Sequence, residues 1–394
     1  MKFSELSKFC AVAVFFAILL LPSLAEAESE LVDITPMIEA ALGNVDLSPW
    51  QEYIADNQYF SSITGGRGVL QFLCDLIRGE ETLSLTNMLN MVLDGAISQA
   101  REHAGLAGLI AGIALITALL EKLGEGLFSG KLLSVSINVM VFSAMGLMIK
   151  GFAQAAGDAF GAVKDMSGLL NATMPILTTF IATMGDKVTL GALQPSVSII
   201  ATATVNILCN VVIPLLTVSA VLVCAHSISG QKVFTSLSSS TKRCSDWMIG
   251  VMFTVFFGFM SIQKLTASAL GGLSVKTVKY TLSSFSLYGG AFLSKSFDVV
   301  TGCAVVLKSV IGGVGMLLLL TVSISPAIKL LVASVIYRFT AFLITLCGES
   351  RISGFMSAIG RIYGALFLCV MTCAILFFAL ISVMCAVGNS LVGL

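Results

Sequence analysis

Lys295 and Asp298 stand three positions apart in the apolar stretch YGGAFLSKSFDVV, residues 288–300. Side chains at this spacing lie on one face of a helix, where a cation and a carboxylate can pair. With Gly289 and Gly290 beside them, the two charges could build a site, or they could mark a wet turn between two membrane helices. A partly solvated local ion pair is worth less than about 1 kcal/mol. We therefore predict that the charges position the chain or contact a partner at a membrane boundary, and that the glycines form a hinge or a close-packed turn.

Arg338 and Lys308 are two further charges that we expect inside the membrane or at its boundary. Arg338 lies near the centre of the apolar run 330–348. An ionisable side chain at membrane depth is a functional or structural candidate by default. Its candidate partners are Asp298, Glu349 and backbone carbonyls. Alternatively, its long apolar stem lets the charge reach the membrane interface.

Motifs for nucleotide binding, metal binding or hydrolysis are weak or absent in the sequence. GEGLFSGKLL (124–133) comes close to a phosphate-binding loop, but its glycine spacing is wrong and Leu132 stands where Ser or Thr would bind magnesium. His103 and His226 have no Cys or carboxylate at metal-ligand spacing, and we expect His103 to be solvated next to the membrane. Neither H-E-x-x-H nor G-x-S-x-G occurs. We therefore predict no catalytic, cofactor-binding or metal-binding residue, and a protein that is not an enzyme.

The composition indicates that membrane helices position these residues. The chain has 394 residues, of which 57% are hydrophobic and 11% are charged, whereas soluble domains carry about 25% charged residues. Several uncharged runs approach or exceed the length of about 18 residues that indicates a transmembrane helix. The predicted fold class is all-α, a polytopic helical membrane protein.

The N-terminal third has a different character from the remainder. Residues 1–27 predict a signal peptide, because a basic start and a short apolar stretch precede the cleavage pattern Ala25-Glu26-Ala27; the alternative is an uncleaved first membrane helix. Residues 28–104 hold 12 acidic and 3 basic residues, with apolar residues at helical spacing. Since positive charge is retained on the cytoplasmic side, we expect this part to be an extracytoplasmic segment of amphipathic helices. Residues 105–394 are predicted to be the multi-pass membrane domain.

Apolar runs in the membrane domain predict about six to eight spans. The runs that support them are 105–120, 132–149, 188–225, 247–262, 309–328, 330–348 and 362–388. Residues 151–187 are ambiguous between an amphipathic stretch and a short or re-entrant span. The basic, serine-rich segment 229–243 is predicted to be a cytoplasmic loop. We expect Pro195 to start a helix and Pro214 to kink it.

Small and polar residues within the spans predict contacts between helices. Gly108 and Gly112 have the spacing that lets two membrane helices approach closely, and Gly312 and Gly315 are assigned to close packing as well. A second pattern recurs every four residues and forms one slanted polar stripe on a helix: Ser198, Thr202, Asn206 and Asn210. The stripe could line a pore, or it could hold a helix–helix seam through amide and hydroxyl hydrogen bonds, which we favour.

Two blocks of the sequence resemble the stage III sporulation protein AE family. One is QPSVSIIATATVNILCNVVIPLLTVSAVL (194–222). The other begins KYTLSSFSLYGGAFLSKSFDVVTGCAVVLKSVIGGVG (279–315) and continues to SPAIK (325–329). In the second block the residues that fit the family pattern are Lys279, Tyr280, Gly289, Gly290, Ser294, Asp298, Gly302, Lys308, Gly312, Gly315, Pro326 and Lys329. Ser286-Leu287-Tyr288 and Ser309 depart from it, where a proline-containing lead-in and an asparagine are typical.

The resemblance implies a non-enzymatic membrane subunit of the channel or secretion-like apparatus that joins the mother cell to the forespore. It implies a mother-cell membrane protein around the engulfed forespore, required for late forespore development. Implied partners are the other stage III A sporulation membrane proteins and, through them, a forespore-side membrane protein. The family supplies no catalytic residues, cofactor or nucleic-acid partner. Two alternatives stay open: self-association into a homo-oligomer, and an autonomous small-molecule transporter with a midplane site near Arg338, Asn206 and Asn210.

Overall fold

The computed structural model describes residues 50, 71, 85–124, 130–183, 187–284, 290–348 and 350–386. Within these ranges, the side chains of residues 263–284 and 290–303 lie outside the description. The predicted signal peptide (1–27) and most of the predicted acidic segment also lie outside the described residues.

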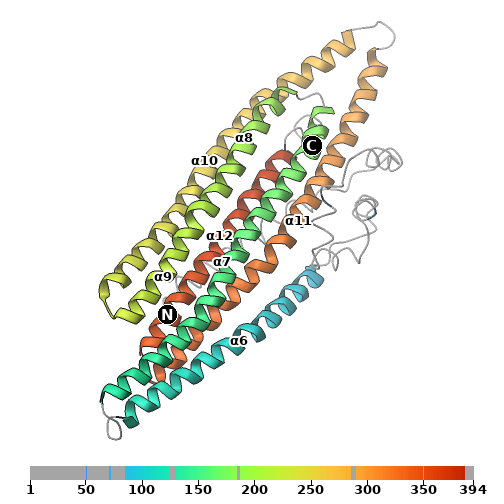
Figure 1. Ribbon diagram of the computed structural model, residues 1–394. Helices are drawn as coiled ribbons and strands as arrows, with labels where there is room; N and C mark the ends of the chain where they lie inside the picture. Colours follow the sequence, from blue (N-terminus) through green and yellow to red (C-terminus); the bar gives the residue numbers. More distant parts are fainter. Residues whose placement is uncertain are drawn as a thin grey trace.

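The described elements are helices, and they pack side by side into an elongated bundle (Figure 1). In chain order they are α6 (Leu85–Gly124), α7 (Gly130–Thr183), α8 (Lys187–Ile207), the π-helical segment η1 (Leu208–Val212), α9 (Ile213–Ser229), α10 (Lys232–Ser284), α11 (Gly290–Leu346) and α12 (Ser350–Ala386).

Six stretches of these helices are long and apolar enough to cross a membrane. They are Val92–Lys122, Leu133–Ala182, Gln194–Ser229, Lys232–Ile262, Ala304–Leu346 and Arg351–Ala386. Their lengths run from 31 to 50 residues, whereas a bilayer core needs about 20. The helices therefore tilt or project beyond the hydrocarbon layer. This result agrees with the predicted all-α polytopic membrane protein and gives six candidate spans among the described residues.

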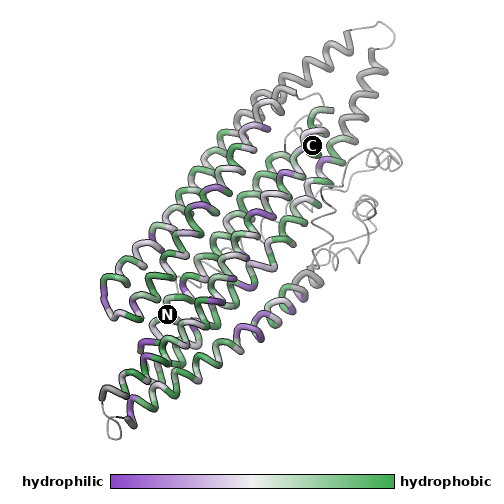
Figure 2. The backbone as a smooth tube through the Cα atoms, in the orientation of Figure 1, coloured by the Kyte–Doolittle hydropathy of each residue, from purple (hydrophilic) through white to green (hydrophobic). Residues whose placement is uncertain are grey.

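The outer surface of the bundle is apolar, as contact with lipid requires. Figure 2 shows hydrophobic residues along most of each helix, with hydrophilic positions scattered between them. Leu109, Val135, Val255 and Phe339 are each more than 60% exposed. Apolar patches of this extent are rare on soluble monomers. In a bilayer the same side chains meet acyl chains instead of water.

The C-terminal helix α12 lies at the centre of the bundle. It packs against α11 and α7 and, on its other side, against α9 and α10. In the most hydrophobic 18-residue stretch of α12, 78% of the residues are buried inside the bundle, compared with 22% in α7 and 28% in α10. Cys369 and Cys373, one turn apart, are fully buried in this helix. A helix that is apolar on all sides suits such a central position.

Two predicted spans, 309–328 and 330–348, form one continuous helix, α11, so the prediction of separate spans is wrong. Lys329, which divided them in the sequence, continues the helix because its ammonium group pairs with Asp158 of α7. The ambiguous residues 151–183 likewise continue α7 without a break.

The predicted cytoplasmic loop 229–243 is also wrong, because only Gly230 and Gln231 separate α9 from α10. Gly230 has φ of 68° and ends α9 in the left-handed conformation, with its N–H donated to the carbonyl of His226 at 2.8 Å. The serine-rich stretch that follows is helical, and its hydroxyls are satisfied by carbonyls one turn earlier in the helix, as that of Thr241 is by the carbonyl of Leu237 at 2.9 Å.

The three elements α8, η1 and α9 follow one another without a gap and form one uninterrupted helical segment. The predicted helix start at Pro195 is wrong, because α8 begins at Lys187 and Pro195 lies inside it. Pro214 lies in the first turn of α9, directly after η1. Since proline cannot donate an N–H and its ring crowds the preceding turn, the wider π turn accommodates it.

Candidate functional site

Three aromatic and imidazole side chains meet in the interior of the bundle, one each from α6, α11 and α12. Nδ1 of His103 lies 3.2 Å from the hydroxyl oxygen of Tyr337. The rings of Tyr337 and Tyr363 are 5.2 Å apart between centroids at an interplanar angle of 67°. His103 is 7% exposed, Tyr337 2% and Tyr363 1%. The expectation that His103 is solvated is therefore wrong, because α6 packs against α11 and Tyr337 covers the imidazole.

An ion pair lies next to these three residues. Nζ of Lys329 donates to the carboxylate of Asp158 at 2.6 Å, joining α11 to α7. Lys329 is close enough to His103, and Asp158 to Tyr363, for each pair to interact electrostatically. The two charged side chains retain 24% and 36% exposure. We name these five residues, His103, Asp158, Lys329, Tyr337 and Tyr363, the polar cluster.

One atom of the polar cluster has no hydrogen-bond partner among the described residues. Nε2 of His103 is buried and unpaired, although Nδ1 of the same ring faces Tyr337. Buried polar atoms nearly always have a partner, so an exception calls for a functional or structural reason.

Phe152 of α7 covers the cluster from the side through an edge-to-face contact with Tyr363, at 5.7 Å between centroids.

Arg338 directly follows Tyr337 in α11 and packs onto two glycines of α12. A Cβ at Gly360 would lie 2.9 Å from Cγ of Arg338, and a Cβ at Gly364 would lie 2.9 Å from Nη2. The hydroxyl of Ser334 donates to the carbonyl of Gly360 at 2.7 Å. The close approach of α11 and α12 therefore depends on these glycines, which the sequence analysis did not single out. The predicted partners Asp298 and Glu349 lie outside the described side chains.

The predicted close-packing glycines fall into three groups. At Gly312 a Cβ would overlap Sγ of Cys385 in α12, and at Gly315 it would lie 2.9 Å from Cγ2 of Thr173 in α7. Gly108 and Gly112 are exposed, and a Cβ at either would meet nothing within 4 Å. Gly289 lies outside the described residues, and Gly290 is the first residue of α11.

The N-terminal part contributes one described side chain to the bundle. Trp50 is fully buried, and its Nε1 donates to Oγ1 of Thr173 at 3.1 Å. Its ring lies 3.7 Å from where a Cβ at Gly315 would stand. No sequence pattern predicts this contact, because a tryptophan in an acidic segment does not specify its partner.

Lys308 is fully buried within α11, so it is an interior residue of the bundle. Sγ of Cys385 lies 3.9 Å from the carbonyl oxygen of Lys308. Lys295 and Asp298 belong to the first turns of α11. Their predicted pairing falls on side chains outside the description.

The four residues of the polar stripe, Ser198, Thr202, Asn206 and Asn210, lie together on α8 and η1 and are all exposed. Because they are exposed in the described part of the chain, they do not belong to the buried core around α12.

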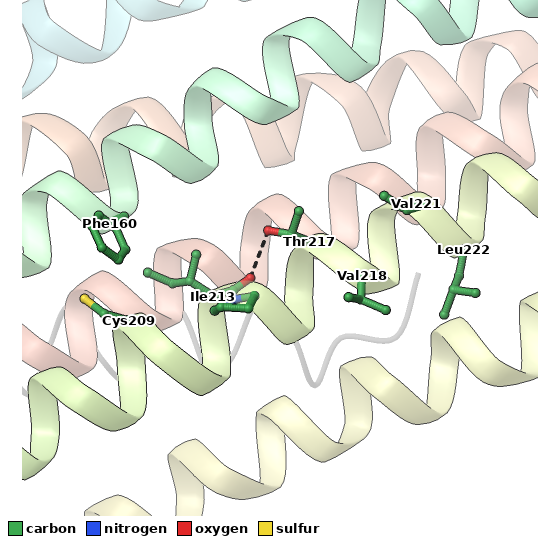
Figure 3. Close-up of a pocket in the computed structure, with 8 residues that line it drawn as sticks. Phe160, Cys209, Ile213, Thr217, Val218, Val221 and Leu222 are labelled. Atoms are coloured by element: carbon green, nitrogen blue, oxygen red, sulfur yellow. Dashed lines mark hydrogen bonds between the residues drawn. The ribbon is translucent and has the colours of Figure 1, made fainter.

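A shallow apolar hollow of about 520 Å³ lies between α7 and the segment formed by η1 and α9 (Figure 3). Its walls are formed by Phe160, Cys209, Ile213, Pro214, Thr217, Val218, Val221 and Leu222. The single hydroxyl in it, that of Thr217, donates to the carbonyl of Ile213 at 3.0 Å. Such a surface suits an apolar side chain or an acyl chain better than a polar ligand.

Six long apolar helices that enclose a polar cluster define a multi-pass helical membrane protein. A model of the family described as stage III sporulation protein AE matches residues 69–388, and the chain belongs to this family. A relative is stage III sporulation protein AE of Bacillus subtilis (strain 168), 22% identical over 317 residues, which cover 80% of this chain and 79% of the relative. No solved structure matches. The family expected from the two sequence blocks is therefore confirmed, and the protein is a membrane protein of sporulation.

Proposed function

We propose that the protein is a non-enzymatic membrane subunit of the channel or secretion-like apparatus that connects mother cell and forespore. The observation that carries the proposal is the family match over residues 69–388, which includes all six candidate spans. The protein resides in the mother-cell membrane around the engulfed forespore and supports late forespore development. Its partners are the other stage III A membrane proteins and, through them, a forespore-side membrane protein.

The N-terminal part has the role of an extracytoplasmic docking segment in this proposal. Residues 1–27 direct export and are cleaved, and the acidic residues between 28 and the start of the first candidate span at Val92 meet partners. The burial of Trp50 against Thr173 supports a segment held close to the membrane domain. In this arrangement the ends of α7 and α11 near Trp50 face the forespore.

The closed interior supports a subunit rather than an autonomous transporter. Tyr337 and Tyr363 are almost fully buried, and Arg338 rests directly on Gly360 and Gly364. A transporter needs a binding site that opens alternately to each side of the membrane. In the described conformation side chains fill the region around Arg338, where such a site was considered.

Co-purification from sporulating cells tests the proposal. A tagged full chain should retain the other stage III A proteins, and deletion of residues 28–84, which stops before α6, should lose them while membrane insertion remains. A matched control is the tagged chain from vegetative cells that lack those partners. If the protein is recovered alone and transports solutes in reconstituted vesicles, the transporter alternative is correct.

A further inference from the structure

Two buried polar atoms of α6 lie one helical turn apart and are both unpaired. Nε2 of His103 and Oε1 of Gln99 have no hydrogen-bond partner in the part of the chain that the structure describes. Both residues belong to the candidate span Val92–Lys122, where acyl chains offer no hydrogen bond in exchange. Unpaired buried polar atoms are rare and cost free energy. Two of them on one helix therefore indicate a ligand that they share.

The spacing of the two residues lets one small ligand reach both. Residues four positions apart have their Cβ atoms about 5–6 Å apart on one face of a helix. Aromatic and other long side chains lean toward the N-terminus of their helix, so the imidazole of His103 extends over the turn that carries Gln99. Since both atoms are unpaired, they do not bond to each other directly. A molecule between them can bond to both.

The packing of α6 against α11 limits the size of this ligand. Nδ1 of His103 already lies 3.2 Å from the hydroxyl oxygen of Tyr337, and the two rings meet edge to face at 5.7 Å between centroids. His103 is 7% exposed and Tyr337 is 2% exposed. Because the interior is closed around the ring, a ligand beside Nε2 must be small.

The charges around the site favour a neutral ligand. Lys329 of α11 and Glu102 of α6 both act electrostatically on His103, with opposite signs. The ammonium group of Lys329 disfavours a bound cation, whereas the carboxylate of Glu102 and the amide oxygen of Gln99 disfavour an anion. Among the described residues, no group of three or more His, Cys, Asp or Glu side chains is placed to hold a metal ion.

The hydrogen-bonding chemistry of the two atoms selects a molecule that both donates and accepts. The amide oxygen of Gln99 can only accept, and Nε2 of a neutral imidazole donates in one tautomer and accepts in the other. Water can donate to the oxygen and can serve the nitrogen in either role. Buried waters typically make about two to four hydrogen bonds to groups that otherwise lack a partner.

We propose that Gln99 and His103 bind one water molecule, which donates to Oε1 of Gln99 and bonds to Nε2 of His103. Together with the contact between Nδ1 and Tyr337, this water forms a hydrogen-bonded chain from α6 to α11. The water stays bound whichever ring nitrogen carries the proton, so the site accepts both tautomers of His103. The polar cluster is then a hydrated site inside the membrane domain.

Solid-state NMR of the full chain in lipid vesicles, with 15N in the histidine rings, tests the proposal. The chain contains two histidines, and His226→Gln leaves His103 as the labelled ring. Magnetisation from water protons should reach Nε2 of His103 at short mixing times. Gln99→Met should abolish this signal, while Gln154→Met, the same change at an exposed position of α7, should leave it intact.

Two results of this experiment would overturn the proposal. If Nε2 of His103 receives no magnetisation from water when Gln99 is present, the site is dry or the amide bonds to the ring directly. If the signal persists in Gln99→Met, the amide does not hold the water.

Thermal unfolding in detergent gives an independent readout. Gln99→Met should lower the melting temperature, because the water loses one partner and Nε2 of His103 is left poorly satisfied. In a His103→Leu background the same change should not lower it, because the amide then shares no water with a ring. An equal fall in both backgrounds would contradict a shared ligand.

Discussion

Lys329 of α11 donates to Asp158 of α7 at 2.6 Å, across 171 positions of the sequence. The pair lies within the apolar spans of both helices. Electrostatic attraction is stronger there than in water, because the surrounding dielectric is low. Its position beside His103 and Tyr363 makes it the charged end of the polar cluster.

Removal of one partner of this pair should destabilise the bundle. In Asp158→Asn the ammonium group of Lys329 loses its counterion, and we expect the free energy of unfolding to fall by about 1–3 kcal/mol. This loss is smaller than for a fully buried pair, because both side chains are partly exposed. Thermal unfolding in detergent measures the change. The control is Asp246→Asn, which breaks the pair with Lys242 at the same 2.6 Å distance. Because this pair lies four residues apart within α10 and joins no two helices, its loss should cost less than about 0.5 kcal/mol. Equal losses in the two variants would contradict an interior role.

The hydroxyl of Tyr337 should couple energetically to His103. Tyr337→Phe leaves Nδ1 of His103 buried without a partner, and we expect a loss of about 1–3 kcal/mol. In a His103→Leu background the same change should cost much less, because no imidazole is left unpaired. A double-mutant cycle on unfolding free energies measures the coupling. Additive losses would mean that the 3.2 Å contact between Nδ1 of His103 and the hydroxyl of Tyr337 contributes nothing to the free energy of unfolding.

Alanine at two glycines of α12 should change stability in opposite directions. Gly360→Ala places a methyl group 2.9 Å from Cγ of Arg338 and 3.3 Å from the carbonyl oxygen of Ser334, and overpacking of this kind costs about 1–3 kcal/mol. Gly354→Ala meets nothing within 4 Å, so its higher helix propensity should stabilise by about 0.5–1 kcal/mol. Melting temperatures of the two variants against wild type provide the comparison. Stabilisation by Gly360→Ala would show that the helices are not in close contact there.

The burial of Trp50 can be measured by fluorescence, because the chain contains two tryptophans. Trp247→Phe leaves Trp50, whose emission should be blue-shifted and protected from both aqueous quenchers and brominated lipids. Trp50→Phe leaves Trp247, which is 67% exposed on the outer face and should be quenched by brominated lipids. Strong quenching of Trp50 by iodide would mean that it does not insert between α7 and α11.

The sequence predicts the helical class, the approximate position of each span and the family, because these depend on local hydrophobicity and on residue patterns. It does not predict where helices continue. Lys329 resembles the charge at a span boundary until its partner on α7 is known. The segment 229–243 resembles a loop until its hydroxyls are seen to bond within the helix.

The polar cluster was missed for a related reason. Its members come from four helices, and no spacing along the chain relates His103 to Tyr337 or Asp158 to Lys329. The one available signal was that ionisable residues inside apolar runs need partners. That rule pointed to Arg338, which packs on Gly360 and Gly364 of α12, and it gave no indication of the cluster on the neighbouring turns.

The continuity of α11 has a mechanical consequence. From Lys329 back to Gly290 the helix is unbroken, a distance of about 59 Å at about 1.5 Å per residue. Figure 1 shows its first turns, next to the end of α10, extending past α8 and α12. A rotation of α11 that separates Lys329 from Asp158 must therefore swing this far end as well. A change at the Lys329–Asp158 contact in the interior is therefore transmitted along α11 to its first turns at Gly290.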